Sequence, residues 1–365
     1  MKLGIIGLPQ AGKTTIFNAL TRGNRPVGGP RVTGGGRFEV QTAVVPVADP
    51  RVDTLSALFN PRKTIYAQVT YADIAGVESE SAKGGFGGPL LNQLATMDGF
   101  LQVVRAFENP TVPHPQITVD PRRDLNTLDS ELLLNDMLAV ERKLERLNED
   151  ARKGIVKDKG LHAQELALFN RLLEALSAGQ PLRDLDLPAA DERLLSSYQL
   201  LTRKPMLVVF NVGDDPAEPG ALPDYPHAHS AMVALQGKLE MEIAQLAPDE
   251  AALFLEEYGI AEPSLNRMIK LSYDLLGLES FFTVGEDEVR AWTVRRGATA
   301  PEAAGEIHTD LQKGFIRAEV ASYDELIALG GYNELKAKGK LRLEGKDYIV
   351  RDGDILNIRF SPPAK

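Results

Sequence analysis

The chain has 365 residues, which is more than one compact core usually supports, so we expect two or three domains. Its formal net charge of −10 disfavours non-specific binding to duplex DNA, and the absence of cysteine excludes disulfides, thiolate metal sites and a cysteine nucleophile. No apolar run approaches the roughly 20 residues that span a bilayer. We therefore expect a cytoplasmic protein with neither a membrane nor duplex DNA as its partner.

The beginning of the chain predicts a strand, a loop and a helix. Leu3–Ile6 is apolar and β-prone, and Thr14–Leu20 consists of helix formers with one apolar face. The glycine-rich stretch Gly23–Gly36 has no periodicity and is interpreted as a loop. Two further strands and a third apolar run are expected at Val44–Val47, Ile65–Tyr71 and Leu101–Phe107.

A helical hairpin is expected after Thr127. Two series of apolar residues, spaced alternately by three and four positions, are typical of the contact seam of a coiled coil. They are Leu133, Met137, Val140, Leu144 and Leu147 in the first helix, and Leu166, Phe169, Leu173 and Leu176 in the second. Buried strands return at Met206–Phe210 and Met232–Leu235, so the hairpin is predicted to be an insertion in one α/β domain.

The last part of the chain, from about Phe282, is interpreted as a separate small unit of short strands with one helix. Its predicted strands are Arg290–Val294, Phe315–Val320, Asp347–Val350 and Ile355–Phe360, with a turn at Asp352–Asp354.

The segment Gly7-Leu-Pro-Gln-Ala-Gly12-Lys13-Thr14 matches the pattern G-x-x-x-x-G-K-[ST] without a mismatch. Glycines let successive backbone N–H groups point at a phosphate, and the following helix adds its positive N-terminal dipole. Lys13 would reach the β- and γ-phosphates, and the Thr14 hydroxyl would bind magnesium. Because the match lies between a predicted strand and a predicted helix, the sequence predicts a nucleotide-binding P-loop.

Two further motifs end buried strands. Asp73-Ile-Ala-Gly76 places an aspartate where it would hold magnesium through water, and a glycine where it would sense the γ-phosphate. Asn211-Val-Gly-Asp214 lies where GTPases read the base. Asp214 could accept hydrogen bonds from guanine, but Val212 replaces the lysine that packs over the base, so guanine recognition is incomplete.

The chain resembles the YchF-type Obg-like ATPases, a branch of the translation-factor GTPases, nearly from end to end. The resemblance rests on GLPQAGKTTIFNAL, on ADIAGV followed by AKGGFGG, and on the run RAWTVRRGATAPEAAGEIHTDLQKGFIRAEV with LRLEGKDYIVRDGD. The last two segments look like the family's TGS domain, a ubiquitin-like β-grasp module. The resemblance implies an α/β fold with a G-domain-like P-loop NTPase sheet (residues 1–120 and 203–280), an inserted coiled-coil hairpin (121–202) and a C-terminal TGS-like domain (281–365).

The resemblance also implies a slow, ribosome-associated ATPase with magnesium as cofactor. Val212 agrees with the family's preference for ATP, whereas Asp214 replaces the expected Glu and leaves GTP open as the ligand. Val77 matches the hydrophobic residue that stands in place of a water-orienting glutamine, so hydrolysis should be slow. No residue is assigned as catalytic with certainty, although Lys13 would stabilise the phosphates. The residues expected to bind nucleotide are Gln10, Ala11, Gly12, Lys13, Thr14, Thr15, Gly76, Asn211, Val212, Asp214, Gln236 and Gly237, and those expected to hold magnesium are Thr14 and Asp73.

The largest departure from the family is in the first switch. Gly36 and Arg37 occupy the positions of the family's threonines, and Thr33 and Thr42 are possible substitutes. We expect weaker magnesium coordination and very slow or partner-dependent turnover. The alternative is a nucleotide-sensing scaffold protein with little or no hydrolysis. His308 could be taken for a catalytic residue but is interpreted as having a structural or partner-contact role, and Trp292 is interpreted as a core residue.

Overall fold

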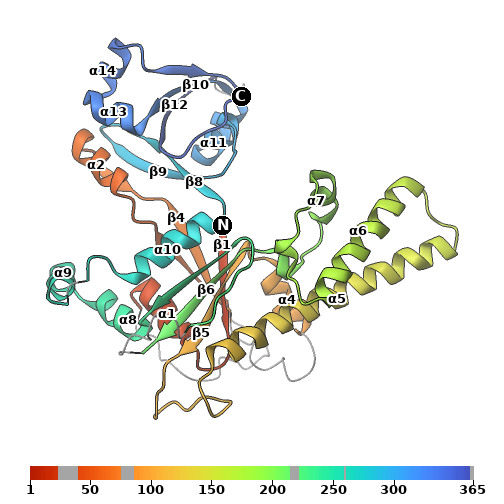
Figure 1. The fold of residues 1–365 in the computed structure, drawn as a ribbon. Helices are drawn as coiled ribbons and strands as arrows, with labels where there is room; N and C mark the ends of the chain where they lie inside the picture. Colours follow the sequence, from red (N-terminus) through yellow and green to blue (C-terminus); the bar gives the residue numbers. More distant parts are fainter. Residues whose placement is uncertain (24–39, 75–85, 214–221, 259, 362–365) are drawn as a thin grey trace. The chain divides into compact units, whose positions relative to one another are not determined.

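The computed structural model describes residues 1–23, 40–74, 86–213, 222–258 and 260–361 (Figure 1). The chain falls into two compact units. Unit 1 comprises Met1–Ala43 and Thr70–Met268, and unit 2 comprises Val44–Val69 and Ile269–Lys365. Each unit therefore combines two stretches that are distant in the sequence.

The sheet of unit 1 has the strand order β2-β4-β1-β5-β6-β7. From β4 to β7 all neighbouring strands run parallel. β5 and β6 are buried along almost their whole length, which explains their mainly apolar sequences, because parallel strands are usually covered on both faces. The strands are β1 (Lys2–Gly7), β2 (Val40–Pro46), β4 (Gln68–Ile74), β5 (Gly99–Ala106), β6 (Met206–Val212) and β7 (Ser230–Leu235).

Helices cover this sheet. Leu90 and Leu94 of α4 join Leu125, Leu128 and Leu132 of α5 in one apolar cluster with the strands, while α1 packs against α8. Among the described helices, none combines the length and the apolar character that crossing a bilayer requires. The helices that begin in unit 1 are α1 (Lys13–Thr21), α4 (Gly88–Ala95), α5 (Pro121–Arg152), α6 (Lys159–Ser177), η2 (Leu182–Asp184), α7 (Ala189–Leu195), η3 (Leu201–Arg203), α8 (Gly237–Gln245), α9 (Pro248–Glu257) and α10 (Ser264–Leu275).

The expected helical hairpin is formed by α5 and α6, which project from the sheet of unit 1 (Figure 1). Asp120 caps α5 by accepting a hydrogen bond from the Arg123 amide at 3.0 Å, so the helix begins at Pro121, earlier than predicted. The α5 seam is confirmed, since Val140, Leu144 and Leu147 are buried and Leu133 and Met137 are partly buried.

The buried face of α6 is wider than the predicted seam. Its buried residues are Leu168, Phe169, Leu172, Ala175 and Leu176, whereas the predicted Leu166 and Leu173 are only partly buried. The reason is that α6 packs on two sides, against α5 and against Leu182, Leu195 and Leu200 of the returning chain. A helix with two neighbours needs a broader apolar stripe than a two-helix seam provides.

A buried carboxylate ties the hairpin to the strand that re-enters the sheet. Asp136 of α5, which is fully buried, accepts hydrogen bonds from the Leu201 amide (2.8 Å), the Thr202 amide (2.7 Å) and the Thr202 hydroxyl (2.7 Å). The two amides lie in η3, directly before β6, where buried N–H groups need partners. Asp136 therefore fixes the position of α5 relative to the start of β6.

Lys204, next to η3, closes the end of α4. Its ammonium donates hydrogen bonds to the carbonyl oxygens of Leu94 (2.9 Å), Ala95 (2.7 Å) and Met97 (2.6 Å). A cation at a helix C-terminus interacts favourably with the helix dipole and with carbonyls that lack helical partners. Burial nevertheless lowers the pKa of Lys204 from 10.5 to about 8.

Because of this lowered pKa, the loss of stability on replacing Lys204 should depend on pH. Between pH 8 and 10.5 the folded protein binds fewer protons at Lys204 than the unfolded chain does, so wild-type stability rises with pH across this window. We expect Lys204→Met to destabilise the protein at pH 7 by about 1–2 kcal/mol, through the lost hydrogen bonds. After a reduction for partial solvent screening, the loss should be about 1 kcal/mol larger at pH 9.5. Urea unfolding at both pH values measures this difference.

The control is Lys346→Met, which removes an exposed lysine of unit 2 and should cost the same at both pH values. A destabilisation by Lys204→Met that stays constant or shrinks as the pH rises would contradict the assignment of the penalty to the buried ammonium.

Unit 2 contains a mixed six-stranded sheet with the order β11-β10-β12-β8-β9-β3. Its strands are β3 (Lys63–Ile65), β8 (Leu278–Thr283), β9 (Glu288–Arg295), β10 (Phe315–Ser322), β11 (Arg342–Glu344) and β12 (Asp354–Phe360). Its helices are α2 (Pro50–Phe59), α11 (Ala300–Ile307), α12 (Thr309–Lys313), α13 (Tyr323–Leu329) and α14 (Tyr332–Ala337). The alanines of α11 pack with Phe281, Val320 and Leu356 in the core of this unit.

The stretch 44–69 is joined to unit 2 by pairing and by charge. β3 runs parallel to β9, with Thr64 opposite Val289. Arg51 of α2 lies 2.7 Å from an Asp352 carboxylate oxygen and also pairs with Asp49 at 2.8 Å. The Arg51 guanidinium lowers the pKa of Asp352 although burial of that carboxyl opposes the shift.

Two predictions that concern unit 2 need correction, and one helix was missed. Asp347–Val350 is not a strand: Ile349 forms only an isolated bridge with Thr299, and the strand beside β10 is β11. Ile65–Tyr71 is divided between β3 and β4, which belong to different sheets. The helix α2 was not predicted at all, although Asp49 before Pro50 is a helix start signal.

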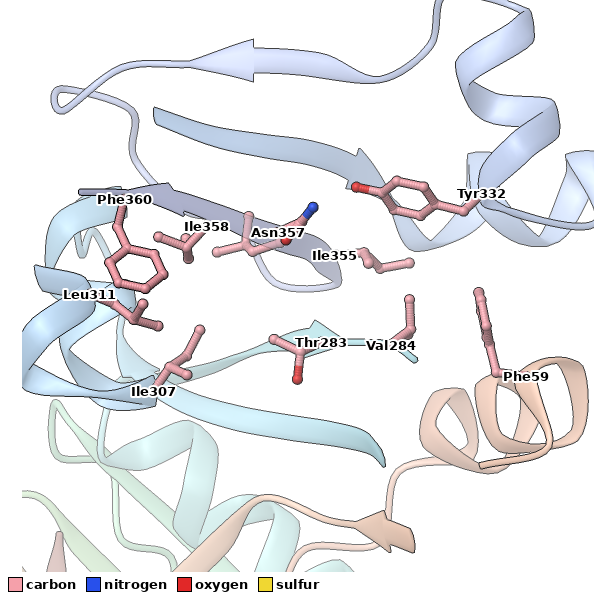
Figure 2. Close-up of a pocket in the computed structure, with 11 residues that line it drawn as sticks. Phe59, Thr283, Val284, Ile307, Leu311, Tyr332, Ile355, Asn357, Ile358 and Phe360 are labelled. Carbon is pink, nitrogen blue, oxygen red and sulfur yellow. The ribbon is translucent and has the colours of Figure 1, made fainter. Parts of the chain in front are cut away.

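Strand β12 extends beyond β8, and a cavity of about 520 Å³ lies next to the overhang (Figure 2). The two strands pair only where Ile355 lies opposite Phe282. Ile307, Leu311 and Phe360 lie at one end of the cavity, and Phe59 and Tyr332 at the other. This lining is mainly apolar.

Candidate functional site

The loop between β1 and α1 is built from left-handed backbone. Gln10 has φ 60° and Gly12 has φ 97°. A Cβ atom on Gly12 would lie 2.1 Å from the Asn211 amide nitrogen, and one on Gly7 would lie 2.4 Å from the Val103 carbonyl oxygen. Both contacts are too short for any side chain, so the loop requires glycine at these two positions.

The side chain of Lys13 lies inside this loop. The side chain is 8% exposed, and its ammonium donates hydrogen bonds to the carbonyl oxygens of Gly7 and Leu8, both at 2.9 Å. The first turn of α1 contains no acidic residue. A helix N-terminus with a lysine and no carboxylate attracts an anion, since the dipole and the ammonium both carry positive charge there.

Asn211 connects the loop to a second segment. Its amide nitrogen donates to the Ala11 carbonyl at 3.0 Å, and its amide oxygen accepts from the Gly237 N–H at 3.0 Å. Gly237 also lies close to this side chain, because a Cβ on Gly237 would lie 2.6 Å from the Asn211 oxygen. The side chain of Asn211 therefore holds the loop, the end of β6 and the start of α8 at fixed positions.

Strand register brings the remaining candidates to the same edge. Gly7 lies opposite Val103, Ile5 opposite Asp73 and Asn211 opposite Leu235. All of these strands are parallel, so their carboxyl ends meet, which is the place where α/β sheets bind ligands. The described candidates on these strands therefore lie at one edge of the sheet.

Thr14 and Asp73 provide oxygen donors that fit magnesium. Asp73 is 2% exposed at the carboxyl end of β4, and Thr14 lies in the first turn of α1. Hydroxyl and carboxylate oxygens are ligands that Mg²⁺ prefers. Within the described ranges, no three His, Cys, Asp or Glu side chains form a metal-binding group. Mg²⁺ usually takes one or two protein ligands and completes its shell with water and phosphate.

The other predicted residues lie near this cluster or outside the described ranges. Gln10 is exposed in the loop, Ala11 is buried and Thr15 is in α1. Val212 is 8% exposed at the end of β6, and the Gln236 side chain donates to the Gly213 carbonyl at 3.1 Å. Thr42 is exposed in β2. The residues Thr33, Gly36, Arg37, Gly76, Val77 and Asp214 lie outside the described part of the chain.

A buried polar pair after β5 was not foreseen from the sequence. His114 lies 2.8 Å from the Asp124 carboxylate, and its other ring nitrogen accepts from the Gln116 amide at 3.1 Å. The neutral ring therefore satisfies both nitrogens, with the proton on the side of Asp124. The Arg105 side chain donates to the Val112 carbonyl at 2.7 Å and holds the same loop. Only the path of this loop brings these groups together, so no sequence signal identifies the pair.

His308 and Trp292 both make hydrogen bonds within unit 2. The His308 ring accepts a hydrogen bond from the Asp310 amide at 3.1 Å and so caps α12. The Trp292 indole donates to the Thr283 hydroxyl at 2.9 Å, and the Arg290 guanidinium lies 3.8 Å from the centre of its ring.

Comparison with known proteins gives full-length relatives. The chain is 41% identical over 367 residues to the "Ribosome-binding ATPase YchF" of Haemophilus influenzae, which covers 99% of both chains. It is 40% identical over 368 residues to the protein of the same name from Bacillus subtilis, covering 98% of each. It is 36% identical over 371 residues to "Obg-like ATPase 1" of Oryza sativa subsp. japonica, covering 99% of this chain and 92% of the relative.

The fold and the C-terminal part have matches of their own. The family model YchF-GTPase_C, described as "Protein of unknown function (DUF933)", matches residues 278–361. The solved structure of the Schizosaccharomyces pombe YchF GTPase superposes with a TM-score of 0.83 at 30% identity, covering 98% of this chain and 97% of that one. The resemblance seen in the sequence motifs is thus confirmed over the whole length, and the chain belongs to the YchF and Obg-like ATPase family.

Proposed function

We propose that this protein binds ATP with Mg²⁺ at the loop Gly7–Gly12, hydrolyses it slowly, and uses the nucleotide state to regulate an association with the ribosome in the cytoplasm. The names of the relatives support both the nucleotide and the ribosome. The observation that carries the proposal is the arrangement of the loop, in which the Lys13 ammonium is bonded to the Gly7 and Leu8 carbonyls and the loop leads into the N-terminus of α1.

Different groups of the loop have different roles in binding the phosphates. The backbone N–H groups between Gly7 and Lys13 bind phosphate oxygens, and Lys13 neutralises charge on the β- and γ-phosphates. Thr14 and Asp73 would hold Mg²⁺, which supplies further neutralisation of the phosphates when bound. Hydrolysis then proceeds by in-line attack of water on the γ-phosphate, helped mainly by positioning and charge stabilisation.

The proposal favours ATP over GTP as the bound nucleotide. The side-chain amide of Asn211 already forms hydrogen bonds with Ala11 and Gly237, so Asn211 mainly stabilises the conformation of the site. Val212 gives a short apolar surface where a GTPase would place a lysine over the base. Asp214 is the one residue of the motif that favours guanine. The names of the relatives reflect the same ambiguity, since the bacterial relatives are called ATPases and the S. pombe protein a GTPase.

Calorimetric titration with non-hydrolysable ATP and GTP analogues, each with Mg²⁺, tests this assignment. We expect the ATP analogue to bind about tenfold more tightly, which corresponds to about 1.4 kcal/mol. Lys13→Ala should weaken binding by roughly tenfold to a hundredfold, because it removes charge-assisted hydrogen bonds to phosphate. Tighter binding of the GTP analogue would reassign the protein to guanine. Absence of binding by both analogues would overturn the nucleotide proposal.

A second candidate function is a nucleotide-sensing scaffold with little or no turnover. The sequence of the first switch favours it, since Gly36 and Arg37 replace the family's threonines, and Val77 offers no group to orient water. A single-turnover assay separates the two functions: phosphate release from bound ATP supports the enzyme, and stable ATP supports the scaffold. In either case we propose that residues 1–120 and 203–280 form the nucleotide-binding domain, 121–202 the hairpin insertion and 281–365 a TGS-like module that contacts partners.

A further inference from the structure

One edge of strand β12 is left largely uncovered by its neighbour β8. β12 pairs with β10 from Asp354 to Phe360, but with β8 only where Ile355 lies opposite Phe282. Within the described ranges, residues 356–360 therefore have no strand partner on the side of β8. At 3.2–3.4 Å per residue, this uncovered edge is about 16 Å long.

The backbone of this segment directs hydrogen-bonding groups to the uncovered edge. The Ser361 amide donates to the Gly314 carbonyl at 2.9 Å, on the side of β10. Alternate residues of a strand direct their backbone polar groups to opposite edges, so the N–H and C=O groups of Ile358 and Phe360 face away from β10. Such a row of donors and acceptors is a template for pairing with another extended chain.

The cavity of about 520 Å³ follows the same edge (Figure 2). Ile355, Leu356, Asn357 and Ile358 all line it, although the side chains of successive strand residues point to opposite faces of a sheet. A cavity that touches all four side chains lies beside the strand and not on one of its faces. Across the cavity from β12 lie residues 283–284, where the chain leaves β8, so the cavity is a slot between two segments of unit 2.

The lining of the slot determines what kind of chain it accepts. Among the described residues that line it, none carries a charge, so phosphate groups and charged side chains find no partner there. The edge of a second copy's sheet is too thick to enter, because residues 283–284 close the slot opposite β12. A single extended segment with uncharged, β-prone side chains has both the free backbone groups and the apolar surface that the slot requires.

We propose that the uncovered edge of β12 binds an extended, uncharged segment of a partner protein as an additional strand. Backbone hydrogen bonds to Ile358 and Phe360 supply affinity, and apolar side chains that enter the slot supply selectivity. The slot lies within unit 2, so this inference goes beyond the proposed nucleotide binding and does not depend on it.

The test uses the full-length protein and the synthetic peptide acetyl-KTVIVTK-amide, whose central residues match the length of the uncovered edge. Hydrogen exchange of single amides is followed by NMR as the peptide is added. We expect saturable binding with a dissociation constant below about 1 mM. At saturation the amides of Ile358 and Phe360 should exchange about tenfold more slowly, whereas those of Asn357 and Arg359, which face β10, should keep their rates.

A modified peptide separates strand addition from apolar binding. N-methylation of the three central residues keeps the apolar side chains but removes N–H donors on both edges of the peptide. We expect this peptide to bind at least about tenfold more weakly, through the loss of backbone hydrogen bonds.

Two matched variants locate the binding edge. Phe360 is 42% exposed beside the slot, and Leu343 is 46% exposed on β11, the outer edge strand of the same sheet. We expect Phe360→Ala to weaken binding of the peptide about fivefold, through lost apolar contact, and Leu343→Ala to leave it unchanged.

Three results overturn the proposal: no saturable binding by the wild type, equal binding of the N-methylated peptide, or slowed exchange at Leu343 in place of Ile358 and Phe360. The second result would leave an apolar pocket without strand addition, and the third would place peptide pairing at β11. Titration with the ATP analogue should give the same affinity for the wild type and for both variants, since the altered residues belong to unit 2.

Discussion

Replacing Gly12 with alanine is expected to lower the affinity for ATP about a hundredfold. The new Cβ would lie 2.1 Å from the Asn211 amide nitrogen, so Asn211 must move and release its hydrogen bonds to Ala11 and Gly237. Each of these bonds contributes about 1 kcal/mol, and a left-handed alanine costs a further 1 kcal/mol or so. The loop must regain its wild-type geometry to bind the phosphates, so this sum of about 3 kcal/mol is lost from the binding free energy, which corresponds to about two orders of magnitude in affinity. Calorimetry with the ATP analogue measures it.

The matched control for this prediction is Gly277→Ala. Gly277 also has positive φ, at 64°, but a Cβ there meets nothing within 4 Å. It therefore carries the backbone penalty without the collision, and we expect a loss of about 1 kcal/mol in stability with unchanged ATP affinity. If Gly12→Ala bound ATP within twofold of wild type, the contact between Gly12 and Asn211 would not be what shapes the site.

We expect Asp136→Ala to lower the free energy of unfolding more than Lys204→Met or Gly277→Ala does. It leaves the buried amides of Leu201 and Thr202 and the Thr202 hydroxyl without their acceptor. An unsatisfied buried donor costs about 1–3 kcal/mol, and neighbouring losses are not additive, so we expect about 3–5 kcal/mol in total. Native-state hydrogen exchange is the appropriate measurement, because two compact units need not unfold together.

The exchange rates of the Leu201 and Thr202 amides should rise most in this variant, together with those of α5 and α6. Glu145→Ala on the exposed face of α5 is the control and should change stability by less than about 0.5 kcal/mol. Unchanged protection of Leu201 and Thr202 in Asp136→Ala would show that these amides have another acceptor and that the hairpin is anchored elsewhere.

Local sequence signals predicted those parts of the molecule that depend on local structure. The strand, loop and helix around Gly7–Thr14 were predicted because the glycine spacing and the flanking apolar residues lie within one short segment. The α5 seam was predicted because a 3–4 spacing is a property of one helix. The buried strand β6 was predicted for the same reason, since Met206–Phe210 is a continuous apolar run, and β5 was noted as an apolar run at Leu101–Phe107.

Features that depend on distant parts of the chain were not predictable. β3 has three residues and becomes a strand only by pairing with β9, more than two hundred positions later. The motif around Asn211 pointed to base recognition, whereas its bond to Ala11 joins positions that are 200 residues apart. The pairing of His114 with Asp124 depends on a loop without periodicity. In each case the partner is supplied by the tertiary fold, about which a local pattern contains no information.

Unit 2 is built from two stretches of the chain that the ribosome synthesises at different times. Val44–Val69 leaves the ribosome early, but the strands and helices it joins begin only at Ile269. At 5–20 residues per second, the intervening 200 residues or so take roughly 10–40 s to translate. During that time β3 has no strand to pair with, and Arg51 lacks Asp352. The second unit is therefore complete only when Ile269–Lys365 has been made and has joined Val44–Val69. A fragment that starts at residue 281 would lack one edge strand of its sheet.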